Sequence, residues 1–259
     1  MTILDTVRRG ETIKNTYIVD AHMHICRVPK FFSRGASLEE IIDTMDRVGV
    51  NTGIISNLWN TGEYWLGYEE VIRAVERYPG RFVGHISPNP NYDSFLKDFY
   101  YCLDSRCFKG IKLHPIQNML PFDHPLYCEV YKAAAKNKMP VLLHTWGTDD
   151  IHKMEELGTC FPETVFIMGH SGGEINALLE AADAASKYDN LYLDTACSYT
   201  WYGTLEMMIK KAGASKVLFG SDAVWNCTAA AIGRVAYADI PEEDKNLILG
   251  ENAKRLYNL

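Results

Sequence analysis

The residues with the clearest chemical potential are two histidines separated by one position, His22 and His24, which close the mostly apolar stretch 17–21. Side chains two positions apart in a β-strand project from the same face, so this spacing places the two imidazoles side by side. Imidazole nitrogens bind Zn²⁺ and related metals, and two of them make half of a metal site. An isolated pair of this kind also arises by chance, so the hypothesis depends on partners elsewhere in the chain.

Partners of suitable types stand at the ends of four later apolar segments: Lys112, His114, His144, His170 and Asp222. Nitrogen and carboxylate donors without a thiolate are typical of Zn²⁺ sites, with Mn²⁺ and Fe²⁺ as alternatives. Three imidazoles and one carboxylate leave a position for water, whose pKa a bound metal brings to about 7. The pattern therefore predicts a catalytic metal centre.

Three of these residues have roles that the sequence leaves open or only suggests. Asp222 has an acceptor oxygen to spare and is the predicted proton acceptor. His170 is expected either to ligate a second metal or to polarise a substrate carbonyl. Lys112 is expected to contact a substrate carboxylate, to be a buried structural ammonium, or to be carbamylated and bridge two metals.

The elements that must position these residues are eight strands, each followed by a helix. The expected strands span residues 17–22, 53–57, 81–87, 110–114, 140–144, 165–170, 191–195 and 217–222. The expected helices span residues 37–48, 69–78, 92–102, 125–136, 150–157, 173–187, 204–211, 228–238 and 242–259. The units recur at intervals of roughly 25 to 35 residues, which suits the crossover connections of parallel strands.

The strand interiors are apolar without alternation, as in 141–143 and 165–168, which is typical of a parallel sheet buried on both faces. We therefore predict a single (β/α)₈ TIM barrel over residues 1–259, with the candidate residues at the C-terminal ends of the strands. An open doubly wound sheet is the alternative, and the lack of a glycine-rich first turn counts against it. His85, inside the third strand, is expected to be a hydrogen-bonded core residue.

Composition excludes several other classes of protein. The net charge of -7 gives no basic footprint for nucleic acid or an anionic membrane surface. No apolar run approaches membrane-spanning length, and residues 1–15 do not resemble a signal peptide. The 7 cysteines lack C-x-x-C spacing and are expected to be reduced and mostly buried. We expect a cytoplasmic protein that acts on a small molecule, and the sequence is compatible with a homo-oligomer.

The blocks 19–24, 110–115 and 219–222, with the closing segment 248–257, resemble the amidohydrolase superfamily, and most of all its amidohydrolase-related branch of short TIM-barrel metal enzymes. The resemblance spans the chain. It implies metal ligands at four positions, His22, His24, His144 and Asp222. It also implies that His170 faces the substrate.

The resemblance bears on the number of metal ions as well. Binuclear members of the superfamily use a carboxylated lysine after the fourth strand, where this chain has Lys112. Short members of the branch often hold one metal. One Zn²⁺ is therefore expected, with Mn²⁺ or Fe²⁺ as alternatives and a second ion if Lys112 is carboxylated. Lys112 is kept with Asp222 and His170 as a candidate catalytic residue.

All five tryptophans follow strand ends, and four of them are expected to contact the substrate: Trp59, Trp146, Trp201 and Trp225. Their faces suit a ring or another flat apolar group, although they would also serve to cap the barrel. His114 and Arg27 are further candidates, the latter through a bidentate pair with a substrate carboxylate.

The first functional hypothesis is a metal-dependent hydrolase that cleaves an amide, ester or lactone bond of a small, ring-containing substrate, with Asp222 moving the proton. The alternative is a metal-dependent, non-oxidative decarboxylase of an aromatic or unsaturated carboxylic acid, because the related branch includes such enzymes and the rim is aromatic. A third class, a metal-stabilised binding protein without chemistry, is disfavoured by the full set of candidate ligands.

Overall fold

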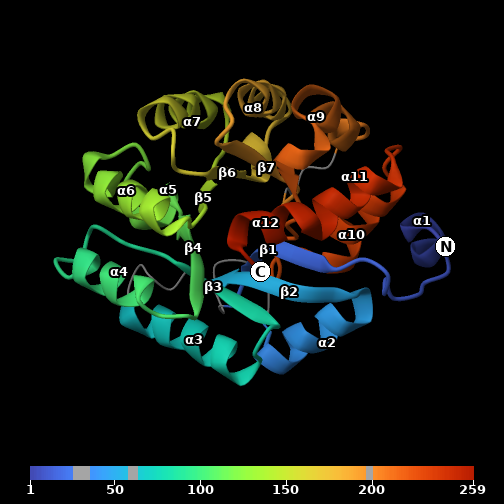
Figure 1. The fold of residues 1–259 in the computed structure, drawn as a ribbon, viewed down its shortest axis with the longest axis horizontal. Coiled ribbons are helices and arrows are strands. Elements are labelled where there is room, and N and C mark those ends of the chain that lie inside the picture. Colours follow the sequence, from blue (N-terminus) through green and yellow to red (C-terminus); the bar gives the residue numbers. More distant parts are fainter. Residues whose placement is uncertain (26–35, 58–63, 197–200) are drawn as a thin grey trace.

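A computed structural model describes residues 1–25, 36–57, 64–196 and 201–259. Eight parallel strands follow one another in the order of the chain, and helices surround them (Figure 1). The strands are β1 (Ile18–His24), β2 (Val50–Ser56), β3 (Phe82–Ile86), β4 (Phe108–Leu113), β5 (Val141–His144), β6 (Phe166–Gly169), β7 (Leu191–Asp194) and β8 (Val217–Leu218). The predicted TIM barrel is confirmed.

The helices of the described residues alternate with these strands. They are α1 (Ile3–Arg8), α2 (Leu38–Val48), α3 (Tyr64–Arg77), α4 (Phe95–Leu103), α5 (Pro115–Asn118), α6 (Cys128–Asn137), α7 (Thr148–Cys160), α8 (Ile175–Lys187), α9 (Thr204–Ala212), α10 (Thr228–Tyr237), α11 (Glu242–Asn246) and α12 (Asn252–Tyr257). Short 3₁₀ segments are η2 (Pro125–Tyr127), η3 (His170–Gly172) and η4 (Ala214–Lys216), and η5 (Leu247–Glu251) is π-helical. Within the described ranges, no helix is long and apolar enough to cross a membrane.

Local sequence explains where the first barrel helix begins and ends. Ser37 accepts a hydrogen bond from the backbone N–H of Glu40, whose side chain accepts in return from the N–H of Ser37, which is the expected capping box. Gly49 ends α2 with a φ of 90°, a conformation that glycine adopts without strain. Helix α1 was not expected, and it begins with a capping box between Thr2 and Asp5.

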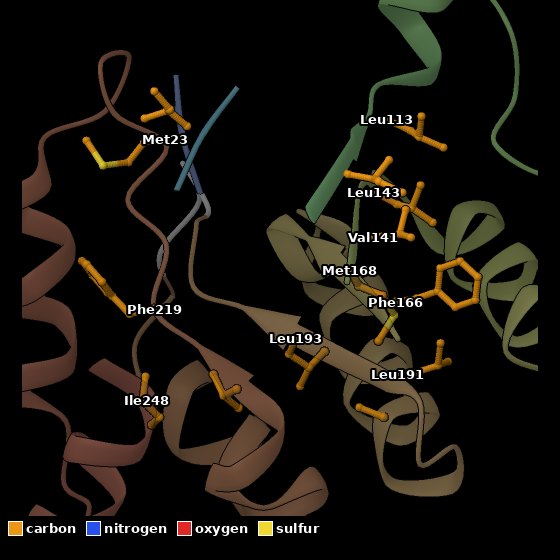
Figure 2. Close-up of a cluster of buried hydrophobic side chains, with 14 of the residues drawn as sticks. Met23, Leu113, Val141, Leu143, Phe166, Met168, Leu191, Leu193, Phe219 and Ile248 are labelled. Atoms are coloured by element: carbon orange, nitrogen blue, oxygen red, sulfur yellow. The ribbon is translucent and has the colours of Figure 1, made fainter. Parts of the chain in front are cut away.

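Two apolar layers hold the barrel together. Alternate residues of the strands pack outward against the helices, as Figure 2 shows for Leu113, Val141, Leu143, Phe166, Met168, Leu191 and Leu193. The intervening residues form a smaller inner cluster with the last helix: Val19, Ala21, Ile54, Leu142, Ile167, Leu218, Ala253 and Tyr257. Helix α12, which lies over the middle of the ring in Figure 1, therefore closes one end of the barrel.

The seam between the first and last strands is irregular. The eighth strand was expected to reach residue 222, but β8 ends at Leu218 because the chain then bends toward the site. Backbone bonds still close the seam: Ala21 N–H donates to the carbonyl of Phe219 at 2.9 Å, and Asp222 N–H donates to that of His22 at 2.9 Å.

The expectation for the cysteines was only partly right. The five cysteines of the described ranges are unpaired, but only Cys102 is buried. Cys160 and Cys227 are exposed because they stand at helix ends that face solvent, where neither sheet nor helix covers them.

Candidate metal centre

The strand ends converge on a cavity of about 220 Å³. Nine described residues line it: His22, His24, Lys112, His114, His144, Trp146, His170, Asp222 and Trp225. All nine were singled out from the sequence. Trp201 instead is 53% exposed and borders a separate hollow between α9 and α10. Arg27 and Trp59 lie outside the described residues, so their predicted roles stay predictions.

A break in the strand register brings both histidines of the first motif to the cavity. Val19 and Ala21 belong to the inner cluster, whereas Met23 packs in the outer one. The pairing with β2 shifts between Asp20 and Met23, which is the mark of a β-bulge. The bulge changes the alternation, so His22 and His24 both face inward.

Asp194, at the end of β7, orients the first of these histidines. Its Oδ2 lies 2.7 Å from His22 Nδ1, and the ionised form of Asp194 holds the proton of that imidazole on Nδ1. His22 Nε2 is therefore an acceptor, and Lys112 Nζ lies 2.8 Å from it. A neutral imidazole with a free electron pair on Nε2 is the form that binds a metal.

The second histidine faces a buried carboxylate. The hydroxyl of Ser56 lies 3.4 Å from the Met23 carbonyl and 2.9 Å from His24 Nδ1, so it can donate to the carbonyl while it accepts from Nδ1. His24 Nε2 is then an acceptor, yet it lies 3.1 Å from Asp222 Oδ1. That oxygen is buried and has no hydrogen bond assigned to it within the described part of the chain. A cation beside these two atoms would satisfy both, so the donor set fits a metal ion.

The turn after β6 presents the next imidazole. His170 and Ser171 have positive φ values of 66° and 48°, which turn the His170 side chain into the cavity. The N–H of His170 donates to Asp194 Oδ1 at 2.7 Å, and its Nδ1 donates to the carbonyl of Ala196. His170 Nε2 is thereby left as an acceptor, 3.0 Å from His144 Nδ1.

Three of these donors form the tightest group. Ligand atoms of His22, His170 and Asp222 lie within 4.8 Å of one another, and all three residues are buried. His24 and His144, which were predicted as ligands, stand beside this group. His170, predicted to face the substrate, stands inside it. The geometry thus makes His22, His170 and Asp222 a candidate metal triad, and the full ligand set stays a prediction.

The electrostatics of the cavity agree with a cation site. Burial holds the pKa of His22 and of His24 below the ordinary histidine value and lowers the pKa of His170 to about 4, so all three imidazoles are neutral at pH 7. Burial lowers the pKa of Lys112, against the opposing charges of Asp222 and Asp194. For Asp222, burial acts to raise the pKa, but the contact with His24 and the charge of Lys112 help to lower it, and the net shift is downward.

Flat rings build the walls. His114 stacks on His144, with ring centroids 3.9 Å apart and planes 13° apart, and Trp146 lies nearly parallel to His144 at 6.3 Å. Trp225 stacks on His24 at 4.4 Å. Gly173 makes room for Trp146, because a Cβ there would lie 2.6 Å from the indole ring. These rings, with the candidate ligands, line the cavity.

The sequence reading missed Asp194 and Ser56, which contact the candidate ligands from neighbouring strands. The only available signal for Asp194 was its position as an acidic residue at the end of an apolar strand. His85 is the hydrogen-bonded core residue that was expected, since its Nε2 pairs with the hydroxyl of Tyr257 at 2.9 Å.

Comparison with known proteins agrees with this geometry. The family model described as Amidohydrolase matches residues 19–259. The chain belongs to this family. The resemblance inferred from the strand-end motifs is therefore confirmed. No curated protein matches the chain.

Several solved structures share the fold. 5-carboxyvanillate decarboxylase from Sphingomonas paucimobilis has 16% identity and a TM-score of 0.74, with 95% of this chain and 100% of that chain covered. 5-carboxyvanillate decarboxylase from Novosphingobium aromaticivorans has 13% identity and a TM-score of 0.73, with 95% of this chain and 97% of that chain covered. That structure is complexed with manganese and 4-hydroxy-3-methoxy-5-nitrobenzoic acid. 4-oxalomesaconate hydratase from Rhodopseudomonas palustris has 16% identity, a TM-score of 0.69, and coverage of 93% and 95%. At these identities the likeness establishes the fold.

Proposed function

We propose that this amidohydrolase is a metal-dependent, non-oxidative decarboxylase of a small aromatic carboxylic acid. The observation that carries the proposal is the combination of flat aromatic walls, Trp146 and Trp225, with the buried carboxylate of Asp222 on the floor of one narrow cavity. Decarboxylases among the structural neighbours support it, and one of them is complexed with manganese and a benzoic acid. The alternative drawn from the sequence thus becomes the leading reading.

The size of the cavity limits the substrate. Its volume of about 220 Å³ is below the roughly 300–1,000 Å³ of pockets that take drug-sized ligands. A single substituted ring fits this volume. Stacking on tryptophan adds attraction beyond the area that it buries.

The metal ion would be held by His22, His170 and Asp222, with His24 and His144 beside them. When bound, the ion supplies a positive anchor for the carboxylate and a neighbouring oxygen of the substrate. Asp194 and Ser56 keep the proton of each of the first two histidines on Nδ1 and so leave Nε2 available. The identity of the metal, Zn²⁺ or Mn²⁺, stays a prediction.

Asp222 would move the proton. Its low pKa keeps it ionised at neutral pH, and Asn226 donates to its Oδ2 at 3.3 Å. With a hydroxybenzoate, Oδ2 takes the proton of the ring hydroxyl and delivers it to the ring carbon that carries the carboxylate. The bond to the carboxylate then breaks, its electron pair stays with the ring, and CO₂ leaves. The product departs as a phenolate that takes a proton from water.

Hydrolysis, the first hypothesis from the sequence, is the second candidate, and the membership of the amidohydrolase family favours it. The two reactions share Asp222 as the proton carrier. They differ in the substrate and in whether the cavity admits water to the reacting carbon.

The experiment uses the full chain loaded with Mn²⁺ in D₂O and a panel of single-ring hydroxybenzoic acids. The expected result is release of CO₂ and one deuterium at the ring carbon that lost its carboxylate. A parallel panel of esters and lactones in H₂¹⁸O tests the second candidate. Absence of CO₂ throughout overturns the decarboxylase, and ¹⁸O in a released acid identifies a hydrolase instead.

The variant Asp222→Asn tests the proton carrier. General acid–base catalysis contributes about 10²–10⁴-fold, so kcat should fall by at least about 100-fold. The matched control is Asp183→Asn on the outer face of α8, where the carboxylate pairs with Lys211 in solvent. The control should retain wild-type turnover. Undiminished turnover in Asp222→Asn would remove this residue from the mechanism.

A further inference from the structure

Asp194 connects two imidazoles of the candidate triad that come from different strands. Its Oδ2 lies 2.7 Å from His22 Nδ1, at the end of β1. Its Oδ1 accepts from the backbone N–H of His170 at 2.7 Å and from that of Ala196 at 3.2 Å, beyond the end of β6 and β7. Asp194 itself is 1% exposed, so all these bonds lie away from solvent.

The same residue also holds the backbone turn that aims the second imidazole. His170 and Ser171 adopt positive φ values that residues other than glycine rarely take. Ser171 Oγ donates to the Asp194 carbonyl at 2.7 Å, and the Asp194 N–H donates back to Ser171 Oγ at 3.1 Å. A strained turn persists only where the surroundings determine it. Residue 194 contributes through its carboxylate and its backbone, and Thr145 Oγ1 contributes by accepting from the N–H of Gly172.

We infer that Asp194 is a positioning residue that sets the affinity of the site for its metal, by fixing the proton of His22 on Nδ1 and the His170 turn at the same time. This inference rests on the metal-dependent part of the proposed function. It goes beyond that proposal because it assigns metal affinity to a residue that does not line the cavity.

The variant Asp194→Asn separates the two tasks of the carboxylate. An asparagine can keep Oδ1 as acceptor for the N–H groups of His170 and Ala196. Its NH₂ group would then face His22 Nδ1 and donate to it, which moves the imidazole proton to Nε2. A proton on Nε2 occupies the electron pair that the metal needs, so affinity falls while the turn is retained.

A matched control exists in β1. Asp20 is a second buried aspartate, and its Oδ1 accepts from the N–H of His22 at 3.2 Å and from that of Ser221 at 3.0 Å. It contacts the backbone and not the imidazole. Asp20→Asn can retain both backbone bonds and leaves the position of the His22 proton unchanged.

The experiment measures Mn²⁺ binding by calorimetry and the proton position of His22 by ¹⁵N NMR of the metal-free chain, for the wild type and both variants. Loss of an outer partner of a ligating histidine typically weakens metal binding about 10–100-fold, and we expect a loss in this range for Asp194→Asn alone. The wild type and Asp20→Asn should show His22 protonated on Nδ1, and Asp194→Asn should show it protonated on Nε2.

The outcomes are distinguishable from those of the function test. Wild-type Mn²⁺ affinity in Asp194→Asn overturns the inference even if CO₂ is released. Weakened binding together with no CO₂ release from any substrate supports the inference and overturns the decarboxylase. A wild-type chain that binds no divalent metal overturns both. If Asp194→Asn does not fold, the wild-type NMR measurement alone decides, since an Nε2 proton on His22 overturns the inference.

Discussion

The variant Tyr257→Phe tests the support beneath the metal centre. Tyr257, on α12, reaches into the inner cluster of the barrel, and its hydroxyl lies 2.9 Å from His85 Nε2. The two side chains are 2% and 1% exposed. His85 Nδ1 is buried without a hydrogen bond. Removal of the hydroxyl therefore leaves both ring nitrogens of His85 without a partner.

The magnitude follows from this geometry. A buried polar group that loses its partner costs about 1–3 kcal/mol. Burial holds the pKa of His85 well below the ordinary value, so the ring cannot compensate by taking up a proton from solvent near pH 7. For a chain of this size, 1 kcal/mol shifts the melting temperature by about 2–4 °C. A loss of about 2 kcal/mol then lowers Tm by about 4–8 °C.

The assay is calorimetric unfolding, with a urea titration to check that the free energy and not the slope has changed. The control is Tyr237→Phe on α10, where the ring is 57% exposed. A surface change of this kind should stay within about 0.5 kcal/mol. Mn²⁺ affinity should be the same in both variants, because neither ring lines the cavity.

Two results would refute the reasoning. An unchanged Tm in Tyr257→Phe would mean that the hydroxyl does not stabilise His85. A fall in Mn²⁺ affinity at unchanged stability would mean that His85 serves the metal centre, against its assignment to the core.

Three further predictions concern the site directly. Chelation should lower Tm by about 5–11 °C, because an ion at about 100 times its Kd contributes about 2.7 kcal/mol; an unchanged Tm after verified metal removal would contradict a resident ion. Trp225→Leu should raise KM for aromatic acids with little change in kcat, since the cavity wall binds substrate and transition state alike. Trp65→Leu, which lies outside the cavity, should leave steady-state kinetics unchanged. Equal effects of the two variants would exclude Trp225 from substrate binding. Gly173→Ala should both strain a backbone with a φ of 69° and push against Trp146, whereas Gly80→Ala, with a φ of 78° and open space, should show only the strain in Tm. A raised KM in Gly173→Ala but not in Gly80→Ala would support the assignment of Trp146 to the substrate-binding wall. Identical kinetics in the two variants would contradict that assignment.

Much of the barrel and of the site could be predicted because parallel strands leave strong local signals. Apolar runs such as 141–143 identify strands buried on both faces, and the regular spacing of helices identifies the crossovers. Once the barrel is inferred, its geometry brings residues as distant as His22 and Asp222 to the same end. The nine cavity residues were found in this way, from position in the fold and not from proximity in sequence.

What could not be predicted depends on contacts between strands. Asp194 lies in an apolar strand with no motif around it, and its contacts with His22 of β1 and His170 beyond β6 appear only once the barrel is assembled. The place of His170 in the candidate triad has a similar cause. Sequence places it at a strand end, but its positive φ turns the ring to a position that an ideal strand would not allow.

The irregular features of the barrel coincide with the candidate metal centre. A register shift in β1 turns His22 and His24 into the cavity, and positive φ values set the direction of His170 and Asp222. Each of these departures costs free energy, and in an ordinary barrel each would be selected against. They also leave a buried carboxylate oxygen, Asp222 Oδ1, facing imidazole nitrogens without a hydrogen bond. A cation would pair with this oxygen and remove the cost of burying it unpaired. The ion that the site binds is therefore expected to stabilise the same local geometry that catalysis requires.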